Sequence, residues 1–177
     1  MSVVNKAYFS GGCFWCTEAI YKRLKGVLDV KPGYCGGNIQ NPTYKEVCSG
    51  KTGHAETVEI TYDSKKIDFK LLLEIFFNTH DPTTLNRQGN DVGTHYRSIA
   101  FYKNDSEKNI IKNEIQRLLN NKIYKRIVTE VTKFEIFYIA EDYHQDYKIN
   151  NPNNPYIWKV SVPRINDFKK KFPELLK

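Results

Sequence analysis

The stretch Gly11-Gly12-Cys13-Phe14-Trp15-Cys16 decides the interpretation of this chain. It follows residues 6–9, a short apolar segment typical of a strand, and it leads into residues 13–25, whose apolar spacing indicates a helix. A cysteine in the first turn of a helix faces unpaired backbone N–H groups and the positive end of the helix dipole. Both favour the thiolate, which is the nucleophilic form of cysteine. We therefore predict that Cys13 is a reactive nucleophile, left open by the two glycines before it.

Cys16 lies three residues after Cys13 and so on the same face of the predicted helix. The spacing leaves three interpretations open: two buried cysteines that act as small apolar residues, a four-cysteine zinc site, or a redox pair that cycles between dithiol and disulfide. A zinc site usually has two close cysteine pairs, whereas Cys35 and Cys48 are far apart in the sequence. The bulky residues between Cys13 and Cys16 look like the walls of an apolar pocket, which distinguishes the pair from a thioredoxin-like motif.

The remaining pattern predicts one α/β or α+β domain over residues 1–177, with a mixed sheet flanked by helices. Residues 56–62 alternate with period two and form the clearest strand, and residues 67–79 form an apolar helix. Residues 131–139 predict another strand, which a long irregular C-terminal tail follows. The polar segment 82–94 lies between two regular elements, and a loop of that length usually has a functional role. Further elements are predicted at residues 27–34, 43–48, 96–102, 106–121 and 165–172.

The composition and charge restrict the partners and the compartment. The formal net charge is +7, but basic residues such as Lys65-Lys66 and Lys169-Lys170-Lys171 form short scattered groups with acids nearby, so we do not predict nucleic-acid binding. The most apolar stretch, residues 71–77, is too short to span a membrane, and the first residues show no signal peptide. We expect a monomeric cytoplasmic protein whose cysteines stay reduced.

Beyond Gly12-Cys13-Phe14-Trp15, a series of motifs in the same order resembles the A-type methionine sulfoxide reductases, the MsrA family. Each motif is modest by itself, but the ordered set is highly specific and extends from about residue 6 to about residue 150. The matching segments are Gly33-Tyr34, Gly36-Gly37, Asn41-Pro42-Thr43-Tyr44, Val47-Cys48-Ser49-Gly50, Thr52-Gly53-His54-Ala55-Glu56, His80-Asp81-Pro82-Thr83-Thr84, Arg87-Gln88-Gly89-Asn90-Asp91-Val92-Gly93-Thr94, Tyr96-Arg97-Ser98 and Ala140-Glu141-Asp142-Tyr143-His144-Gln145.

The resemblance implies an enzyme that reduces the S epimer of methionine sulfoxide, free or in proteins, back to methionine. Each sulfoxide epimer is reduced by its own class of enzyme. The resemblance also implies a mixed sheet with a ferredoxin-like core and no bound cofactor. Thioredoxin is the implied electron donor, for which dithiothreitol can substitute in an assay.

The resemblance assigns the central chemistry to four residues. Cys13 attacks the sulfoxide sulfur, and Glu56 protonates the oxygen, which requires a raised pKa of the kind that an apolar pocket produces. Tyr44 and Tyr96 occupy the positions of hydroxyl donors to that oxygen. Cys13 is left as a sulfenic acid, which a second cysteine converts to a disulfide.

Three further residues border the implied pocket, and two histidines are candidates to lie behind it. Phe14 and Trp15 are expected to pack on the ε-methyl group of the substrate. Asp91 matches a polar residue at the edge of the site, although a role as the cap of a turn explains it equally well. His54 and His144 are each as well explained by a structural hydrogen bond as by a role beside the site.

The resolving cysteine is the point at which the chain departs from the family pattern. Many members have glycine at the position of Cys16 and resolve with a cysteine near the C-terminus, but no cysteine follows Cys48 here. We expect Cys16 to resolve Cys13, with Cys48 and then Cys35 as alternatives. A general dithiol oxidoreductase is the alternative function; it would need both Cys13 and Cys16 but not Glu56.

Overall fold

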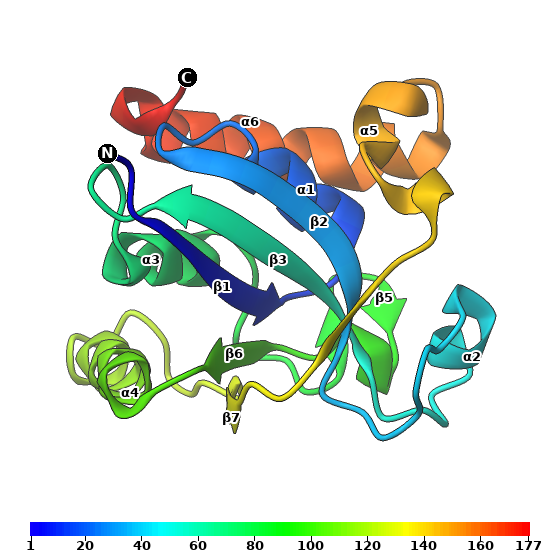
Figure 1. Ribbon diagram of the computed structural model, residues 1–177, viewed down its shortest axis with the longest axis horizontal. Helices are drawn as coiled ribbons and strands as arrows, with labels where there is room; N and C mark the ends of the chain where they lie inside the picture. Colours follow the sequence, from blue (N-terminus) through cyan, green and yellow to red (C-terminus); the bar gives the residue numbers. More distant parts are fainter.

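A six-stranded mixed sheet forms the centre of the computed structural model, which describes residues 1–177 (Figure 1). The strand order is β7-β6-β1-β3-β2-β8. All neighbouring strands are antiparallel except β6 and β7, which run parallel. The prediction of a mixed sheet flanked by helices is therefore confirmed. The strands of this sheet are β1 (Val4–Ser10), β2 (Val27–Cys35), β3 (Ala55–Asp63), β6 (Ile99–Tyr102), β7 (Glu130–Lys133) and β8 (Phe137–Ile139).

The connectivity β1-α1-β2-β3-α3-β6, with the central order β6-β1-β3-β2, agrees with the ferredoxin-like core that the resemblance implies. Helix α1 ends earlier than predicted because the chain turns before β2, where Gly26 has a φ of +88°. The helices are α1 (Phe14–Tyr21), α2 (Tyr44–Cys48), α3 (Phe69–Thr79), α4 (Asp105–Asn120), α5 (Tyr147–Asn150) and α6 (Val162–Lys171). The shorter elements are β4 (Arg87–Gln88), β5 (Asp91–Val92), η1 (Thr94–Tyr96), η2 (Asp142–His144), η3 (Ile157–Ser161) and η4 (Pro173–Leu175).

The C-terminal tail is more regular than predicted. One turn of π-helix, η3, leads directly into α6, which lies alongside α1 (Figure 1). Ile165 and Phe168 hold α6 in place because both side chains are buried in the main core. At the end of the chain, the Lys177 N–H group donates to the Arg23 carbonyl at 2.9 Å. The tail is therefore fixed along the helix that begins at Cys13.

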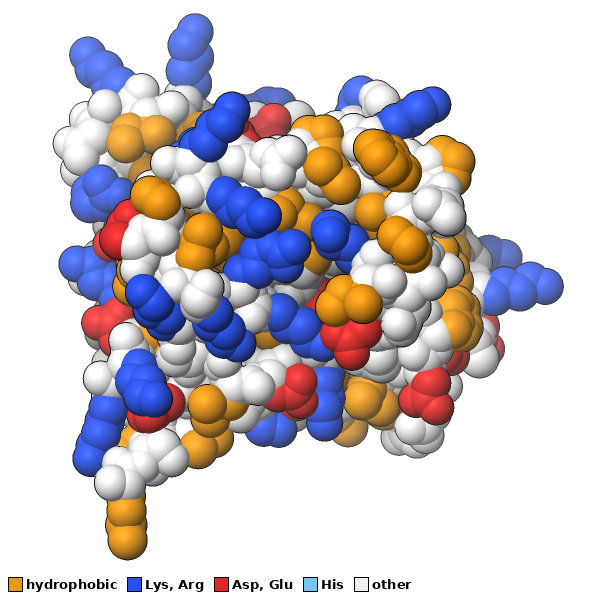
Figure 2. Space-filling model, turned by 90° about the horizontal axis from the view of Figure 1, so that it is seen from above, with side chains coloured by type: hydrophobic (Ala, Val, Ile, Leu, Met, Phe, Trp, Pro, Cys, Tyr) orange, Lys and Arg blue, Asp and Glu red, His pale blue; other side chains and the backbone are white.

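Lysine and arginine side chains gather on the α6 side of the molecule (Figure 2). Three basic residues from separate elements lie near one another: Arg23 follows α1, Lys148 lies in α5 and Lys169 lies in α6. Partial burial lowers the pKa of Lys148, and the positive charges of Arg23 and Lys169 lower it further. These basic residues are therefore less scattered in space than they are in the sequence. No helix combines the length and apolar character that a membrane crossing requires.

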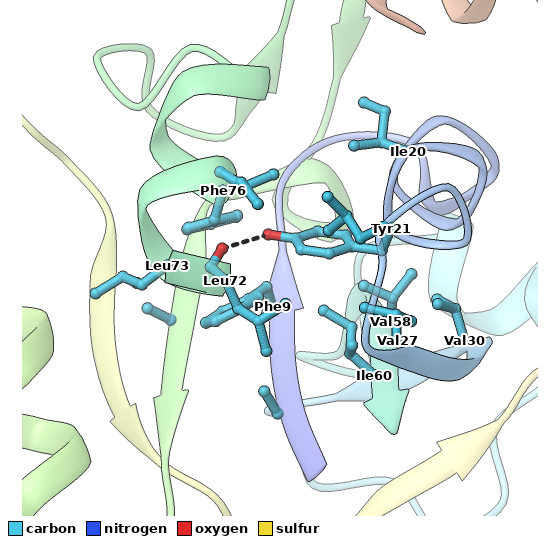
Figure 3. Close-up of a cluster of buried hydrophobic side chains, with 14 of the residues drawn as sticks. Phe9, Ile20, Tyr21, Val27, Val30, Val58, Ile60, Leu72, Leu73 and Phe76 are labelled. Atoms are coloured by element: carbon cyan, nitrogen blue, oxygen red, sulfur yellow. Dashed lines mark hydrogen bonds between the residues drawn. The ribbon is translucent and has the colours of Figure 1, made fainter. Parts of the chain in front are cut away.

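The main hydrophobic core lies between the sheet and helices α1 and α3 (Figure 3). Phe9 of β1 stacks on Phe76 of α3, with ring centroids 4.9 Å apart. The side chain of Tyr21 is fully buried, and its hydroxyl group donates to the Leu72 carbonyl at 2.8 Å. This hydrogen bond satisfies the only polar atom of the Tyr21 side chain. It ties α1 to α3 and thereby helps to fix the position of the α1 start.

Strand β3 positions one side chain of the predicted site. Its side chains alternate between the two faces of the sheet, so Glu56 points to the same face as Ile60 of the main core. Cross-strand pairing places Tyr34 of β2 opposite Glu56 on that face. The next pair, Cys35 and Ala55, packs together on the other face. The period-two pattern therefore directs Glu56 towards α1.

The prediction of a single strand over residues 131–139 is wrong. Two short strands, β7 and β8, occur there, and they lie at opposite edges of the sheet. The chain between them crosses the face of the sheet opposite the main core. Phe134 stacks on Tyr8 with ring centroids 3.9 Å apart, and Phe137 packs beside them. The apolar residues that suggested one long strand therefore cover this second face.

Candidate active site

Cys13 lies at the junction between β1 and α1, where it is the N-cap residue of the helix. The turn depends on Gly12, whose φ of +81° favours glycine, and a Cβ atom there would lie 2.5 Å from the side chain of Gln88. The Gly12 N–H group donates to the Tyr96 carbonyl at 3.3 Å. Cys13 is therefore held against the polar segment that includes Gln88, the segment for which the sequence predicted a functional role.

Cys13 and Cys16 lie at the same helix start, where the Cys16 N–H group donates to the Cys13 carbonyl at 3.2 Å. Cys13 is 5% exposed and Cys16 is 0% exposed. Burial raises the pKa of Cys13 well above its ordinary value, and Cys16 and Glu56 raise it further. The N–H group of Trp15 at the helix start has the smallest effect, in the opposite direction. The expectation that the helix start makes Cys13 a thiolate is therefore not met, because burial outweighs the helix dipole.

The environment of Cys16 has the opposite effect. The Cys16 sulfur lies 3.0 Å from the hydroxyl oxygen of Ser161. The hydrogen bond from Cys13 lowers the pKa of Cys16, and Arg164 and Ser161 lower it further, against the effect of burial. Ser161 and Arg164 both belong to the C-terminal tail, and no sequence pattern pointed to either of them.

Glu56 has the properties of a buried acid. The residue is 2% exposed, and its Oε1 atom accepts a hydrogen bond from the Phe14 N–H group at 3.2 Å. The Oε2 atom is buried without a hydrogen-bond partner. Burial raises the pKa of Glu56 well above its ordinary value and outweighs the opposing effect of the Phe14 N–H group, and the charge of Asp91 adds to the rise. A carboxyl group in this setting retains a proton that it can donate.

Tyr44 and Tyr96 are both half-buried beside Glu56. Burial raises the pKa of each phenol, and the charge of Glu56 raises it further, so both hydroxyl groups remain neutral donors. Tyr44 is the first residue of α2, and its N–H group donates to Glu141 at 3.0 Å, which ties that helix to the tail. Tyr96 ends the turn η1, whereas the sequence predicted that a strand would begin there.

Aromatic rings form another wall of the site. Phe14 is buried, and its ring centroid lies 6.4 Å from that of Tyr44. Trp15 is half-buried, stacks on Tyr147 at 3.7 Å, and donates its indole N–H to the Nδ1 atom of His144 at 3.0 Å. Burial lowers the pKa of His144 to about 4, so its imidazole stays neutral and can accept that hydrogen bond. His144 therefore orients Trp15.

Tyr156 is a member of the site that the sequence analysis missed. Its hydroxyl group donates to the carboxylate of Asp91, and its ring meets Trp15 edge-on with centroids 5.8 Å apart. Burial raises the pKa of Tyr156, and the thiols of Cys13 and Cys16 raise it further. Nothing in the sequence distinguishes Tyr156 from the other tyrosines, because its position depends on the path of the tail.

The two remaining cysteines differ in their access to the site. Cys48 is exposed at the end of α2, where its thiol is within reach of the Tyr44 hydroxyl group. Cys35 is buried on the other face of the sheet, and its thiol donates to the Ile136 carbonyl at 3.1 Å. Because the sheet separates Cys35 from Cys13, we no longer retain Cys35 as a resolving cysteine. The same separation argues against a four-cysteine zinc site.

His54 makes structural hydrogen bonds rather than lining the site. Its Nδ1 atom accepts a hydrogen bond from the Gly37 N–H group at 3.0 Å, and its Nε2 atom lies 2.7 Å from the Ile39 carbonyl oxygen. Because a carbonyl group can only accept, Nε2 carries the proton. Both nitrogen atoms are therefore used to fix the loop that follows β2.

A pair of adjacent thiols beside a buried acid and two phenol donors is the arrangement of a thiol-dependent oxidoreductase. A family model described as Peptide methionine sulfoxide reductase matches residues 5–176. The Peptide methionine sulfoxide reductase MsrA of Saccharolobus solfataricus is 55% identical over 171 residues, which cover 97% of this chain and 96% of the relative. The chain therefore belongs to the peptide methionine sulfoxide reductase family, and it is an enzyme that reduces methionine sulfoxide.

Solved structures share the fold of this chain. Mxr1 from Saccharomyces cerevisiae in reduced form has a TM-score of 0.78 and 34% sequence identity, with 85% of this chain and 87% of that chain covered. Mxr1 in complex with Trx2 has a TM-score of 0.56 and 25% identity, with 81% of this chain and 84% of that chain covered. The architecture is therefore that of the MsrA fold.

Proposed function

We propose that the enzyme reduces the S epimer of methionine sulfoxide, in proteins and as the free amino acid, with Cys13 as the nucleophile and Glu56 as the proton donor. The observation that carries this proposal is the buried Glu56 carboxyl group. Its Oε2 atom has no partner in the protein, and its Oε1 atom is held by an N–H group at the start of the helix that Cys13 caps. An acid and a nucleophile are thereby fixed at one helix start.

The first step transfers the oxygen atom from the substrate to Cys13. The Cys13 sulfur bonds to the sulfoxide sulfur while Glu56 delivers a proton to the sulfoxide oxygen, and the thiol proton of Cys13 replaces the one that Glu56 has given. The hydroxyl group then passes from the substrate sulfur to the Cys13 sulfur: a sulfur–oxygen bond forms on Cys13, while the sulfur–oxygen bond of the substrate and the bond between the two sulfur atoms break. Methionine leaves, and Cys13 is a sulfenic acid. The hydroxyl groups of Tyr44 and Tyr96 stabilise the negative charge that grows on the oxygen during the attack.

The aromatic wall is the proposed site for the methyl end of the substrate. Phe14 and Trp15 offer apolar surface next to the nucleophile, and Trp15 is held by its hydrogen bond to His144. Asp91, which accepts a hydrogen bond from Tyr156, borders the opening. The hydroxyl donors lie on one side of the proposed sulfoxide position, and the aromatic rings lie on the other. Only one epimer can direct its oxygen to the donors and its methyl group to the rings, which supports selectivity for a single epimer.

Cys16 is the proposed resolving cysteine because it is buried with Cys13 at the same helix start, three residues further along the chain. Disulfide formation between them releases the oxygen as water, and a dithiol reductant reopens the disulfide by exchange. The similar structure of Mxr1 in complex with Trx2 supports thioredoxin as that reductant. The electrons come from thiols, so the proposal includes no bound cofactor. Cys48, near Tyr44, is the second candidate for the resolving step.

We further propose that residues 1–177 act as one monomeric catalytic domain in the cytoplasm. The four cysteines are free thiols in the structure. Free thiols fit a compartment in which thioredoxin and glutathione keep cysteines reduced. A monomer suits this mechanism because every residue to which it assigns a role lies on one chain.

Trapping of the sulfenic acid tests the proposed function. A Cys16→Ser variant is mixed with either epimer of a methionine sulfoxide peptide and with dimedone, and the labelled residue is identified by mass spectrometry. We expect stoichiometric methionine and a dimedone adduct on Cys13 with the S epimer only. An adduct on another cysteine would contradict the assigned nucleophile. Reduction of insulin without any sulfoxide turnover would instead favour a general dithiol oxidoreductase.

A further inference from the structure

The C-terminal tail brings a hydroxyl group and a positive charge to the sulfur of Cys16. The Ser161 hydroxyl oxygen lies 3.0 Å from that sulfur, and both residues are 0% exposed. Ser161 ends η3, and α6 follows directly alongside α1 (Figure 1). A buried thiol rarely has a fixed hydroxyl partner by chance, because burial of a polar group without a partner is costly. The contact therefore indicates that Ser161 stabilises a particular state of Cys16.

Arg164 is fixed beside the glycine turn that precedes Cys13. Its Nε and Nη2 atoms donate to the Thr79 carbonyl at 3.0 and 2.8 Å, at the end of α3. Its Nη1 atom lies 3.7 Å from the position that a Cβ atom of Gly12 would occupy. A guanidinium group has five N–H donors, so donors remain for a sulfur atom after the bonds to Thr79. Arg164 therefore presents a permanent positive charge next to the start of α1.

We propose that Ser161 and Arg164 are positioning residues that hold Cys16 as the thiolate, so that Cys16 is the attacking group when the disulfide with Cys13 closes and the leaving group when a reductant opens it. This inference rests on the proposed function, in which Cys16 resolves Cys13. It goes further because it assigns a role to the tail and predicts which sulfur the reductant attacks.

The charged and titratable groups that face Cys16 come from four parts of the molecule: Cys13 on the same helix, Glu56 on β3, Tyr156 on the tail and Arg164 on α6. Glu56 is held neutral by its own burial, and burial likewise keeps Tyr156 protonated. Arg164 is the only one of the four that is positively charged. The pKa of Cys13 is raised and that of Cys16 is lowered, and the Ser161 hydroxyl group contacts the Cys16 sulfur, so the single negative charge of the pair lies on Cys16.

The resolving step balances with these protonation states. After methionine leaves, Cys13 carries a hydroxyl group, Glu56 carries a proton and Cys16 is a thiolate. The Cys16 sulfur attacks the Cys13 sulfur, a sulfur–sulfur bond forms, the sulfur–oxygen bond breaks, and the hydroxyl group takes the proton of Glu56 and leaves as water. The two thiol groups have then supplied the two electrons that reduced the sulfoxide. A dithiol reductant returns two electrons and two protons, one to Glu56 and one to Cys13.

The same geometry determines how the disulfide is opened. In thiol–disulfide exchange, the sulfur whose thiol has the lower pKa leaves faster. The contacts of Ser161 and Arg164 make Cys16 the better leaving group, and Cys13 is also the more accessible of the two, at 5% against 0% exposure. The better leaving group at Cys16 and the greater exposure of Cys13 both favour attack of the incoming thiolate on Cys13. The mixed disulfide with the reductant therefore forms on Cys13.

Single-turnover kinetics test the role of the tail. Reduced enzyme is mixed with less than one equivalent of a methionine sulfoxide peptide, and the methionine formed and the thiols lost are followed separately between about pH 5 and pH 9. In Arg164→Met we expect methionine formation within about twofold of the unmodified enzyme, whereas disulfide closure slows about tenfold near neutral pH and its midpoint moves to higher pH. Arg164→Lys should restore most of the closure rate, and Ser161→Ala should produce a smaller shift in the same direction. Lys170→Met, an exposed charge on the same helix, is the matched control and should change neither rate.

Two results would overturn the inference. One is an unchanged pH profile of closure in both Arg164→Met and Ser161→Ala. The other is slower closure that does not depend on pH and that Arg164→Lys does not restore, since that outcome reports a purely structural role. Absence of methionine formation by the unmodified enzyme would instead contradict the proposed function, so the two failures are distinguishable.

Trapping of the mixed disulfide tests which sulfur is attacked. Oxidised enzyme is incubated with a thioredoxin that lacks its second cysteine, and the linked peptides are identified by mass spectrometry. We expect thioredoxin linked to Cys13. A link to Cys16 would overturn the assignment of Cys16 as the leaving group.

Discussion

Polar groups on the two faces of the central sheet differ in whether they have hydrogen-bond partners. On the face that α1 covers, the Oε2 atom of Glu56 has no hydrogen-bond partner. On the opposite face, Glu59 accepts hydrogen bonds from Tyr8 at 2.9 Å and from Lys6 at 3.0 Å, and the Cys35 thiol donates to a carbonyl group. Buried polar groups in folded proteins normally find partners, so an orphaned one requires an explanation. The comparison therefore assigns the chemistry to the α1 face and a structural role to the opposite one.

The largest expected effect separates Cys13 from Cys35, which are buried on opposite sides of the sheet. Cys13→Ser should lower sulfoxide reduction about a thousandfold or more, because the nucleophile is lost. Cys35→Ser should remain within about twofold of the unmodified enzyme, because the sheet separates Cys35 from the substrate. Turnover with dithiothreitol as the reductant measures both. Equal losses in the two variants would contradict the division of the sheet into a catalytic and a structural face.

The next effect separates two glutamates of one strand. Glu56→Gln should lower the rate about 10²- to 10⁴-fold, the usual contribution of a general acid, whereas Glu59→Gln should have little effect. Because burial raises the pKa of Glu56, the unmodified enzyme should lose activity as the pH rises through that raised value, since the acid is then deprotonated. This decline should be absent from the residual activity of Glu56→Gln. A decline of the same shape in the variant would show that another group supplies the proton.

A smaller effect is expected from the phenols. Tyr96→Phe and Tyr44→Phe should each lower the rate about ten- to a hundredfold with little change in KM, because their hydroxyl groups act on charge that grows in the transition state. Tyr8→Phe on the opposite face is the matched control and should retain full activity. Steady-state kinetics with a methionine sulfoxide peptide measure all three. A loss confined to KM in the Tyr96 and Tyr44 variants would assign them to substrate binding instead.

The smallest effect is on stability. The pKa of Glu56 is higher in the folded state than in the unfolded one, so its contribution to stability is complete below about pH 4.5 and is lost as the pH rises through the folded-state value. Gln cannot ionise, so Glu56→Gln should match the unmodified enzyme at low pH and should have a Tm about 2–4 °C higher above neutral pH. Glu59→Gln should show no such growing advantage. Thermal unfolding at two pH values measures the difference in Tm between Glu56→Gln and the unmodified enzyme. A difference that did not increase with pH would contradict the prediction.

Local patterns in the sequence were sufficient to predict the strand and the helix that carry Glu56 and Cys13. The alternation of residues 56–62 predicted the strand that carries Glu56, and the glycine turn before Cys13 predicted the start of α1. These predictions succeeded because each depends on neighbours close in the sequence. The aromatic residues after Cys13 were recognised for the same reason.

Features that depend on distant parts of the chain could not be predicted from the sequence. Tyr156, Ser161 and Arg164 reach the thiol pair only because the tail packs along α1, and no local pattern records that path. The prediction of one strand over residues 131–139 failed because no glycine or proline marks the crossing between β7 and β8. The pKa of Cys13 was misjudged because the helix start is visible in a sequence, whereas burial is a property of the whole fold.

Epimer-resolved turnover tests the central claim most directly. Reduced enzyme is supplied with dithiothreitol and either the S or the R epimer of a methionine sulfoxide peptide, and methionine formation is measured by chromatography. We expect multiple turnovers of the S epimer and none of the R epimer. Equal turnover of both epimers would contradict the proposed selectivity of the pocket, and no turnover of either by folded, reduced enzyme would contradict the proposed chemistry of Cys13 and Glu56.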